Sequence, residues 1–228
     1  MVIVDSHTHL YHPDETKYPM RDNPARTPPG IGYIDQLKNN MQQAGVERAV
    51  LVQTGSAYRW DNRLLADIAE ANGKSMVGVC NLDAASTESP EIFKSLVSRN
   101  VRGLRLEPTQ HGDPRYYHAG AVKLFETVRE MNGVICAHIH VSFLPDLARL
   151  ADEFPEVPIV LDHCAYLQAS DHLDSIRVKA VCDMARYKNI HANVTFGVTG
   201  SDEVYPFSDT HDVIRKVIAA YTPERCMW

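Results

Sequence analysis

Two histidines separated by one residue follow a short apolar run at the start of the chain. The sequence DSHTH occupies residues 5–9, directly after the run VIV. Side chains alternate along a β-strand, so His7 and His9 are expected to point to the same side. Imidazole is the commonest metal ligand in proteins and suits zinc, iron, nickel or manganese. The pair therefore predicts a metal site, with two unrelated polar loop histidines as the alternative.

Further histidines end two later apolar runs. His138 and His140 are again two residues apart, and His163 follows the run VPIVLD. Active sites of β/α barrels are built where the parallel strands end, so histidines from three strands would converge on one rim. We expect His140 to be a ligand or a proton-transfer group, whereas His138 is either a ligand or a buried core histidine.

A basic and an acidic residue end another expected strand, in the sequence RGLRLEP. Arg105 and Glu107 share one face of that strand. A guanidinium group at the end of a barrel strand can bind a substrate carboxylate through two parallel hydrogen bonds. Both residues are therefore candidate substrate contacts. The alternative is a buried ion pair that holds the rim together.

Short β-branched runs alternate with longer amphipathic segments along the whole chain, which gives seven strand–helix units and the opening of an eighth strand. This rhythm predicts a parallel sheet covered by helices. We expect a TIM-type (β/α)8 barrel that lacks most of strand 8 and helix 8, with residues 1–228 forming a single domain. A doubly wound open sheet is the alternative. It is expected to have a glycine-rich phosphate-binding turn after an early strand, and the sequence has none. The expected strands cover residues 2–5, 48–53, 75–80, 102–106, 133–141, 157–163 and 189–194, and the expected helices include 33–44, 61–72, 121–131, 144–153, 173–187 and 210–221.

The composition limits the classes of function. The 228 residues are 44% hydrophobic and 23% charged, with a formal net charge of −6. Nucleic-acid binding usually needs a basic face, so a small-molecule substrate is the better expectation. No apolar stretch approaches the ~20 residues of a membrane span. The five cysteines form no C-x-x-C pair and are expected to be reduced, which favours a cytoplasmic protein. The sequence leaves open whether the protein forms a homo-oligomer.

Four segments together give the chain a family resemblance: VDSHTHL, QTGSAYRWDN, VRGLRLEP and FPEVPIVLDHCA. In this combination the chain resembles the amidohydrolase-related group, which includes 2-pyrone-4,6-dicarboxylate lactonases, sugar-lactone hydrolases and some aromatic-acid decarboxylases. The resemblance extends over nearly the whole chain. It implies a β/α barrel and, in many members, one divalent metal ion, which is often zinc. A few lactonases of the group use no metal.

The resemblance also implies roles for individual residues. His7 and His9 match the strand-one pair, His140 or His138 matches the strand-five histidine, and His163 matches the histidine after strand six. Tyr58, in the second of the four segments, is a further candidate substrate contact. The expected metal ligands are thus His7, His9, His140 and His138, and the expected catalytic residues are His163 and His140.

One departure from the family pattern concerns strand eight. The family carries an aspartate there, in a run like G-[ST]-D-W-P, that binds metal and acts as general acid and base. This sequence ends at Cys226-Met227-Trp228, where that run should begin. Asp209 and Asp212 match the N-terminal flank of the last expected helix and not the catalytic position.

Together these features predict a metal-dependent hydrolase that acts on a small, carboxylate-bearing lactone or amide. In this reading the metal polarises the substrate carbonyl and acidifies a bound water, and His163 stabilises the developing negative charge. Two alternatives stay open. One is non-oxidative decarboxylation at the same metal, and the other is a truncated pseudo-hydrolase that binds ligands or partners without turnover.

Overall fold

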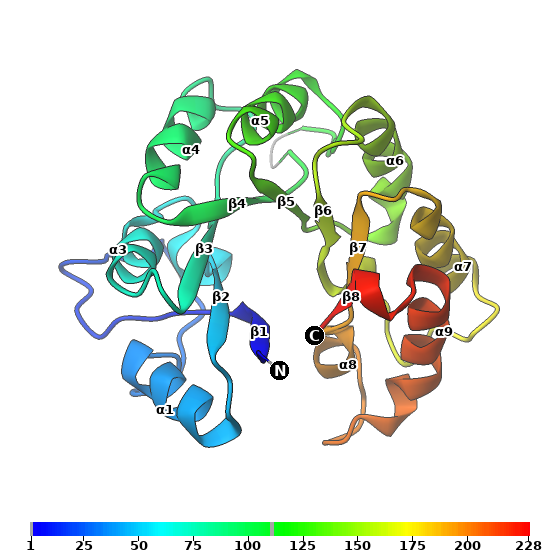
Figure 1. The fold of residues 1–228 in the computed structure, drawn as a ribbon, viewed down its shortest axis with the longest axis horizontal. Coiled ribbons are helices and arrows are strands. Elements are labelled where there is room, and N and C mark those ends of the chain that lie inside the picture. The colour runs from blue at the N-terminus through cyan, green and yellow to red at the C-terminus, as the bar shows by residue number, and fades with distance from the viewer. Residues whose placement is uncertain (1, 110–111) are drawn as a thin grey trace. The chain divides into compact units, whose positions relative to one another are not determined.

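The computed structural model describes residues 2–109 and 112–228. Its contacts divide the chain into two compact units, Met1–Arg105 and Leu106–Trp228. Each unit consists of parallel strands alternating with helices, and each is described separately below (Figure 1).

The first unit contains the first three strands and most of the fourth. In it, β1 pairs with β2, β2 with β3 and β3 with β4, all in parallel. The β2–β3 register places Ala49 opposite Met76 and Val52 opposite Val79. The elements are β1 (Val4–Thr8), α1 (Ile34–Ala44), β2 (Arg48–Val52), α2 (Gly55–Tyr58), α3 (Arg63–Ala71), β3 (Met76–Asn81), α4 (Ser89–Val97) and β4 (Val101–Leu106).

The second unit continues the alternation. Here β5 pairs with β6, β6 with β7 and β7 with β8, again in parallel. Its helices and strands are α5 (Ala119–Glu130), β5 (Val134–Ala137), α6 (Leu144–Glu153), β6 (Ile159–Leu161), α7 (Ile176–Asp183), β7 (Ile190–Asn193), α8 (Phe196–Thr199), α9 (His211–Tyr221) and β8 (Cys226–Met227). Short 3-10 turns join them: η1 (Val141–Phe143), η2 (Asp162–Ala165), η3 (Met184–Arg186), η4 (Ser208–Thr210) and η5 (Pro223–Arg225).

The order of the strands confirms the predicted fold class. They follow one another as β1-β2-β3-β4-β5-β6-β7-β8 in one eight-stranded sheet, with helices between successive strands. This is the topology of a TIM-type (β/α)8 barrel. The eighth strand, β8, comprises two residues.

The apolar spacing seen in the sequence accounts for most of the helices. On α3, Leu64, Leu65 and Ala69 are buried, as their helical spacing predicts. Helix α1 ends at Ala44, as the expected range 33–44 predicts, because Gly45 after it adopts a left-handed conformation (φ 68°). Helix α7 is shorter than predicted. It begins after Ser175, because the Ser175 hydroxyl accepts a hydrogen bond from the backbone N–H of Val178 and caps the helix there.

Two strands end earlier than the sequence suggested. Strand β5 ends at Ala137, so His138 and His140 lie in the segment that follows it. Strand β6 ends at Leu161, and His163 lies in η2 with a left-handed backbone (φ 50°). The prediction that these histidines are strand residues was therefore wrong, although both segments do start at the carboxyl ends of their strands.

All five cysteines are free, as expected. Cys80 on β3 and Cys164 in η2 are completely buried, and burial raises the pKa of both thiols well above the usual range. None of the helices in the described parts of the chain combines the length and apolar character that a bilayer crossing demands.

Candidate active site

His7 and His9 lie together at the carboxyl end of β1. Their Nε2 atoms are 3.3 Å apart, and the two rings meet edge to face. The Nδ1 atom of His9 lies 2.9 Å from the backbone oxygen of Val52, at the end of β2. A carbonyl oxygen can only accept, so Nδ1 of His9 carries the proton, and its Nε2 presents a lone pair beside Nε2 of His7. The two strands thus orient one ring by hydrogen bonding.

This geometry fits a metal ion. Two nitrogens bound tetrahedrally to one zinc ion, at ~2.0–2.1 Å each, lie roughly 3.3–3.4 Å apart. The Nε2 atoms of His7 and His9 have that separation. A metal-binding histidine almost always donates its second ring N–H to a carbonyl or carboxylate, as His9 does to Val52. The predicted strand-one pair therefore forms half of a plausible ligand set without rearrangement.

Tyr58 lies in α2, directly after β2, and is almost completely buried. Its hydroxyl oxygen accepts a hydrogen bond from the backbone N–H of His12. Burial raises the pKa of the Tyr58 hydroxyl. Nearby, the Thr54 hydroxyl donates to the carbonyl oxygen of Leu10. These two contacts fasten the segment after His9 onto the β2–α2 connection.

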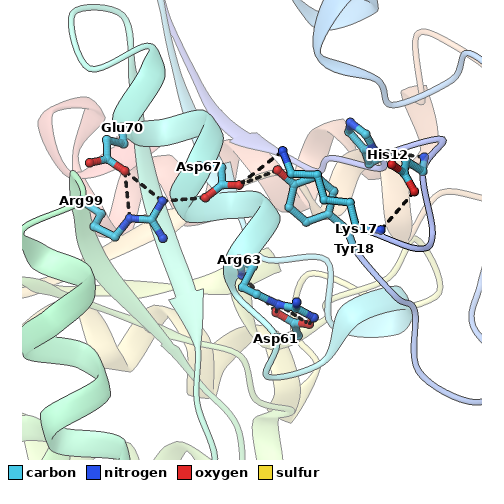
Figure 2. Close-up of polar contacts among 9 residues, drawn as sticks. His12, Lys17, Tyr18, Asp61, Arg63, Asp67, Glu70 and Arg99 are labelled. Atoms are coloured by element: carbon cyan, nitrogen blue, oxygen red, sulfur yellow. Dashed lines mark hydrogen bonds and ion pairs between the residues drawn. The ribbon is translucent and has the colours of Figure 1, made fainter.

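The long connection between β1 and α1 is also fastened to α3 (Figure 2). The buried Tyr18 donates its hydroxyl hydrogen to Asp67, and Arg99 binds both Asp67 and Glu70. Burial acts to raise the pKa of Asp67, but hydrogen bonds from Tyr18 and Arg99 outweigh it and hold that pKa below its usual range. The segment that follows the histidine pair is thus held by a charged network outside the predicted site.

Arg105 occupies β4, opposite Asn81 of β3, and its side chain is only 5% exposed. A buried guanidinium needs hydrogen-bonding partners. We therefore expect such partners to fix the Arg105 side chain near the end of its strand. Rigid placement is what bidentate binding of a carboxylate requires. Glu107, two residues later, has its carboxylate 3.0 Å from Nδ1 of His138.

In the second unit, Glu107, His138 and Tyr166 form a chain of hydrogen bonds. The Glu107 carboxylate accepts from Nδ1 of His138, and the Tyr166 hydroxyl donates to Nε2 of the same ring. Protein groups therefore occupy both ring nitrogens of His138. His140 is exposed instead, and its ring lies against the ring of Tyr166, with 4.8 Å between the centroids. Of the two histidines after β5, His140 is the more available for a metal ion.

His163 lies close to the same tyrosine. Its Nδ1 atom is 2.7 Å from the Thr195 hydroxyl, and its ring centroid is 5.2 Å from that of Tyr166. The backbone from His163 to Tyr166 has four consecutive left-handed residues, with φ between 47° and 60°. Such residues normally occur singly, because each costs about 1–2 kcal/mol. This turn brings Tyr166 back against His138, His140 and His163.

Sequence reasoning missed Tyr166, which contacts three predicted histidines. Periodicity could not find it, because a left-handed turn without glycine leaves no pattern. Arg177 was also missed: its guanidinium donates to the backbone oxygen of Tyr166 and pairs with Asp171, which supports the turn from α7.

Comparison with known proteins adds family and fold relations. The model of the amidohydrolase family matches residues 4–228. No curated protein matches the chain. Solved structures match over its full length. One, from Acinetobacter baumannii, is described as a probable 2-pyrone-4,6-dicarboxylic acid hydrolase with citric acid bound. It is 15% identical with a TM-score of 0.76, and the match covers 100% of this chain and 83% of that one.

Two other solved structures, an amidohydrolase and a decarboxylase, share the fold. An amidohydrolase from Burkholderia multivorans with bound zinc is 18% identical with a TM-score of 0.78, and the match covers 100% of this chain and 83% of that chain. A 5-carboxyvanillate decarboxylase from Sphingomonas paucimobilis is 15% identical with a TM-score of 0.66. The match covers 100% of this chain and 87% of that chain. At these identities the likeness concerns the fold.

Proposed function

We propose that this chain, which belongs to the amidohydrolase family, is a metal-dependent hydrolase acting on a small, carboxylate-bearing lactone or amide. Family membership makes it an enzyme of the amidohydrolase superfamily. The observation that carries the finer proposal is the His7–His9 pair, whose Nε2 atoms have the spacing of two ligands on one ion. The bound zinc of the Burkholderia multivorans amidohydrolase supports zinc as the metal.

In this proposal His7, His9 and His140 hold the ion. A divalent ion bound there supplies polarisation of a carbonyl oxygen and a bound water of lowered pKa. The backbone oxygen of Val52 keeps the His9 ring in the orientation that binding requires. His138 is assigned a supporting role, because Glu107 and Tyr166 occupy its two nitrogens.

The remaining site residues act on the substrate. Arg105 binds its carboxylate, and His163, oriented by the Thr195 hydroxyl, donates a hydrogen bond to the carbonyl oxygen as negative charge develops there. A lactone is favoured over an amide because of the family resemblance and because the Acinetobacter baumannii protein is described as a hydrolase of a pyrone dicarboxylate.

The test combines metal binding with turnover of 2-pyrone-4,6-dicarboxylate by the zinc-loaded protein. We expect ring opening in the wild type. His9→Ala should abolish it and weaken zinc binding by more than the roughly 10–100-fold that loss of an outer-shell partner costs. His12→Ala is the matched control, because Nδ1 of His12 accepts from the backbone N–H of Asp14. Zinc affinity unchanged by His9→Ala, in competition with a coloured chelator, would refute the metal site.

A second candidate is non-oxidative decarboxylation, which the fold likeness to the Sphingomonas paucimobilis decarboxylase favours. Product analysis separates the two reactions, since hydrolysis gives a ring-opened acid and decarboxylation releases carbon dioxide. Ligand and metal binding without either product would favour the binding-only alternative.

A further inference from the structure

Arg59 adopts a backbone conformation that favours glycine. It occupies the second position of a tight turn, Tyr58 to Asp61, closed by a 2.9 Å hydrogen bond from the N–H of Asp61 to the carbonyl oxygen of Tyr58. Its φ of 51° and ψ of −107° are those of a type II′ turn, where glycine dominates at this position. A side chain there is strained, and such strain clusters at functional sites.

Two buried amides hold this turn in place. The Gln53 side-chain N–H donates to the carbonyl oxygens of Arg59 and Asp61, at 3.2 and 2.7 Å. The Asn62 side chain donates to the carbonyl oxygen of Trp60, at 2.9 Å. Both amide side chains are at most 5% exposed. The fold therefore imposes the strained conformation from both sides, and it does so with an arginine in the glycine position.

The Arg59 guanidinium is available to a ligand. Its central carbon lies 4.2 Å from the ring centroid of Trp60. The nearest acidic residue in sequence, Asp61, is already neutralised by Arg63 at 2.5 Å. Among the residues that the structure describes, Arg59 forms no ion pair. A half-buried cation stacked on an indole ring and free of carboxylates suits a planar anion.

The turn is built on the strand end that orients the histidine pair. Gln53, which holds Arg59, directly follows Val52, and Val52 accepts the hydrogen bond from His9. The Thr54 hydroxyl binds the carbonyl oxygen of Leu10, so the residues after His9 run beside the same connection. Arg59 thus belongs to the carboxyl end of β2, where ligands of this fold bind.

We propose that Arg59 and Trp60 form a subsite for a planar carboxylate, and that Arg59 is a specificity-determining residue for an anionic group remote from the reacting carbonyl. This proposal rests on the proposed function, in which Arg105 holds a carboxylate closer to the chemistry. Arg59 lies at the rim and selects substrates whose outer part is flat and negatively charged.

The test uses two stable ring compounds. Isophthalate carries two carboxylates, and 3-carbamoylbenzoate has the same ring with one of them replaced by a neutral amide. Arg59→Ala should weaken isophthalate binding, measured by calorimetry, roughly 10-fold or more, as loss of a charged hydrogen bond implies. Binding of 3-carbamoylbenzoate should change less than about threefold. Arg63→Ala is the matched control: it removes the same charge four residues away, but from a paired arginine, and should leave both affinities unchanged.

Arg59→Gly tests the strain separately. It removes the guanidinium like Arg59→Ala but relieves the backbone, so it should bind isophthalate equally weakly and melt at a higher temperature than Arg59→Ala. Several outcomes would overturn the proposal: no isophthalate binding by the wild type, equal losses for the two compounds, an equal loss in Arg63→Ala, or no gain in melting temperature for glycine over alanine. Isophthalate binding requires no turnover, so these outcomes are independent of whether the chain hydrolyses lactones.

Discussion

At the scale of single residues, hydrogen-bond polarity separates histidines that look alike in the sequence. His9 donates Nδ1–H to a carbonyl and has its Nε2 beside Nε2 of His7, whereas Glu107 and Tyr166 bind the two ring nitrogens of His138. The i, i+2 spacing predicted that His7 and His9 lie together, because the pleat of a β-strand places every second side chain on the same face. It could not decide between His138 and His140, because the partner of His138, Tyr166, is 28 residues away.

Arg105 gives the prediction that belongs to this scale. Arg105→Met should weaken binding of carboxylate-bearing substrates by about 1.5–3 kcal/mol, since a charged hydrogen bond is lost, while neutral analogues of the same shape lose little. Affinities for a matched acid and amide, measured on the folded variant, test this. Equal losses for both compounds would show that Arg105 only supports the rim.

At the scale of elements, alternation of apolar runs located most strands and helices within a few residues. It failed where the backbone leaves standard conformations. Strands β5 and β6 end before their histidines. Residues His163 to Tyr166 form a left-handed turn that contains no glycine, so the sequence gives no local signal for it. Such a turn is specified by long-range contacts, among them the hydrogen bond from Arg177 to the Tyr166 carbonyl, and these are invisible in a local pattern.

The left-handed turn gives the first prediction at this scale. Tyr166→Phe removes the hydroxyl that donates to His138 and should lower the free energy of unfolding by about 1 kcal/mol. Tyr117→Phe is a suitable control, because the Tyr117 hydroxyl binds Glu153 in an exposed position, where less than about 0.5 kcal/mol is expected. Urea unfolding measures both changes. A larger effect at Tyr117 would contradict the importance assigned to the turn.

The anchored β1–α1 connection gives a pH-dependent prediction. The pKa of Asp67 is lowered in the folded chain, so its stabilising effect is fully present above the unfolded-state value of about 3.9. That contribution disappears as the pH falls through the lowered pKa. The difference in unfolding free energy between wild type and Asp67→Asn should therefore be larger at pH 6 than at pH 3. A difference that stays constant over this range would exclude the ionised carboxylate as its source.

At the scale of the whole molecule, the strand order agrees with the barrel that the sequence favoured. One strand per helix, repeated along the chain, fits both a barrel and a doubly wound sheet, and the absence of a glycine-rich turn from the sequence favoured the barrel. The order β1 to β8 is that of the barrel. The sequence also predicted a single domain, while the contacts resolve two compact units. Whether the two units unfold together is therefore a question for experiment.

The reaction rates of two buried thiols can answer that question. Cys80 lies in the first unit and Cys164 in the second, and both are inaccessible in the folded chain. A thiol reagent can modify such a side chain only during the moments when its surroundings open. Labelling in dilute urea, followed by mass spectrometry of the two peptides, times the opening of each half independently. Equal rates with equal urea dependence are expected for one cooperative domain, whereas a faster Cys80 or Cys164 would identify the half that opens first.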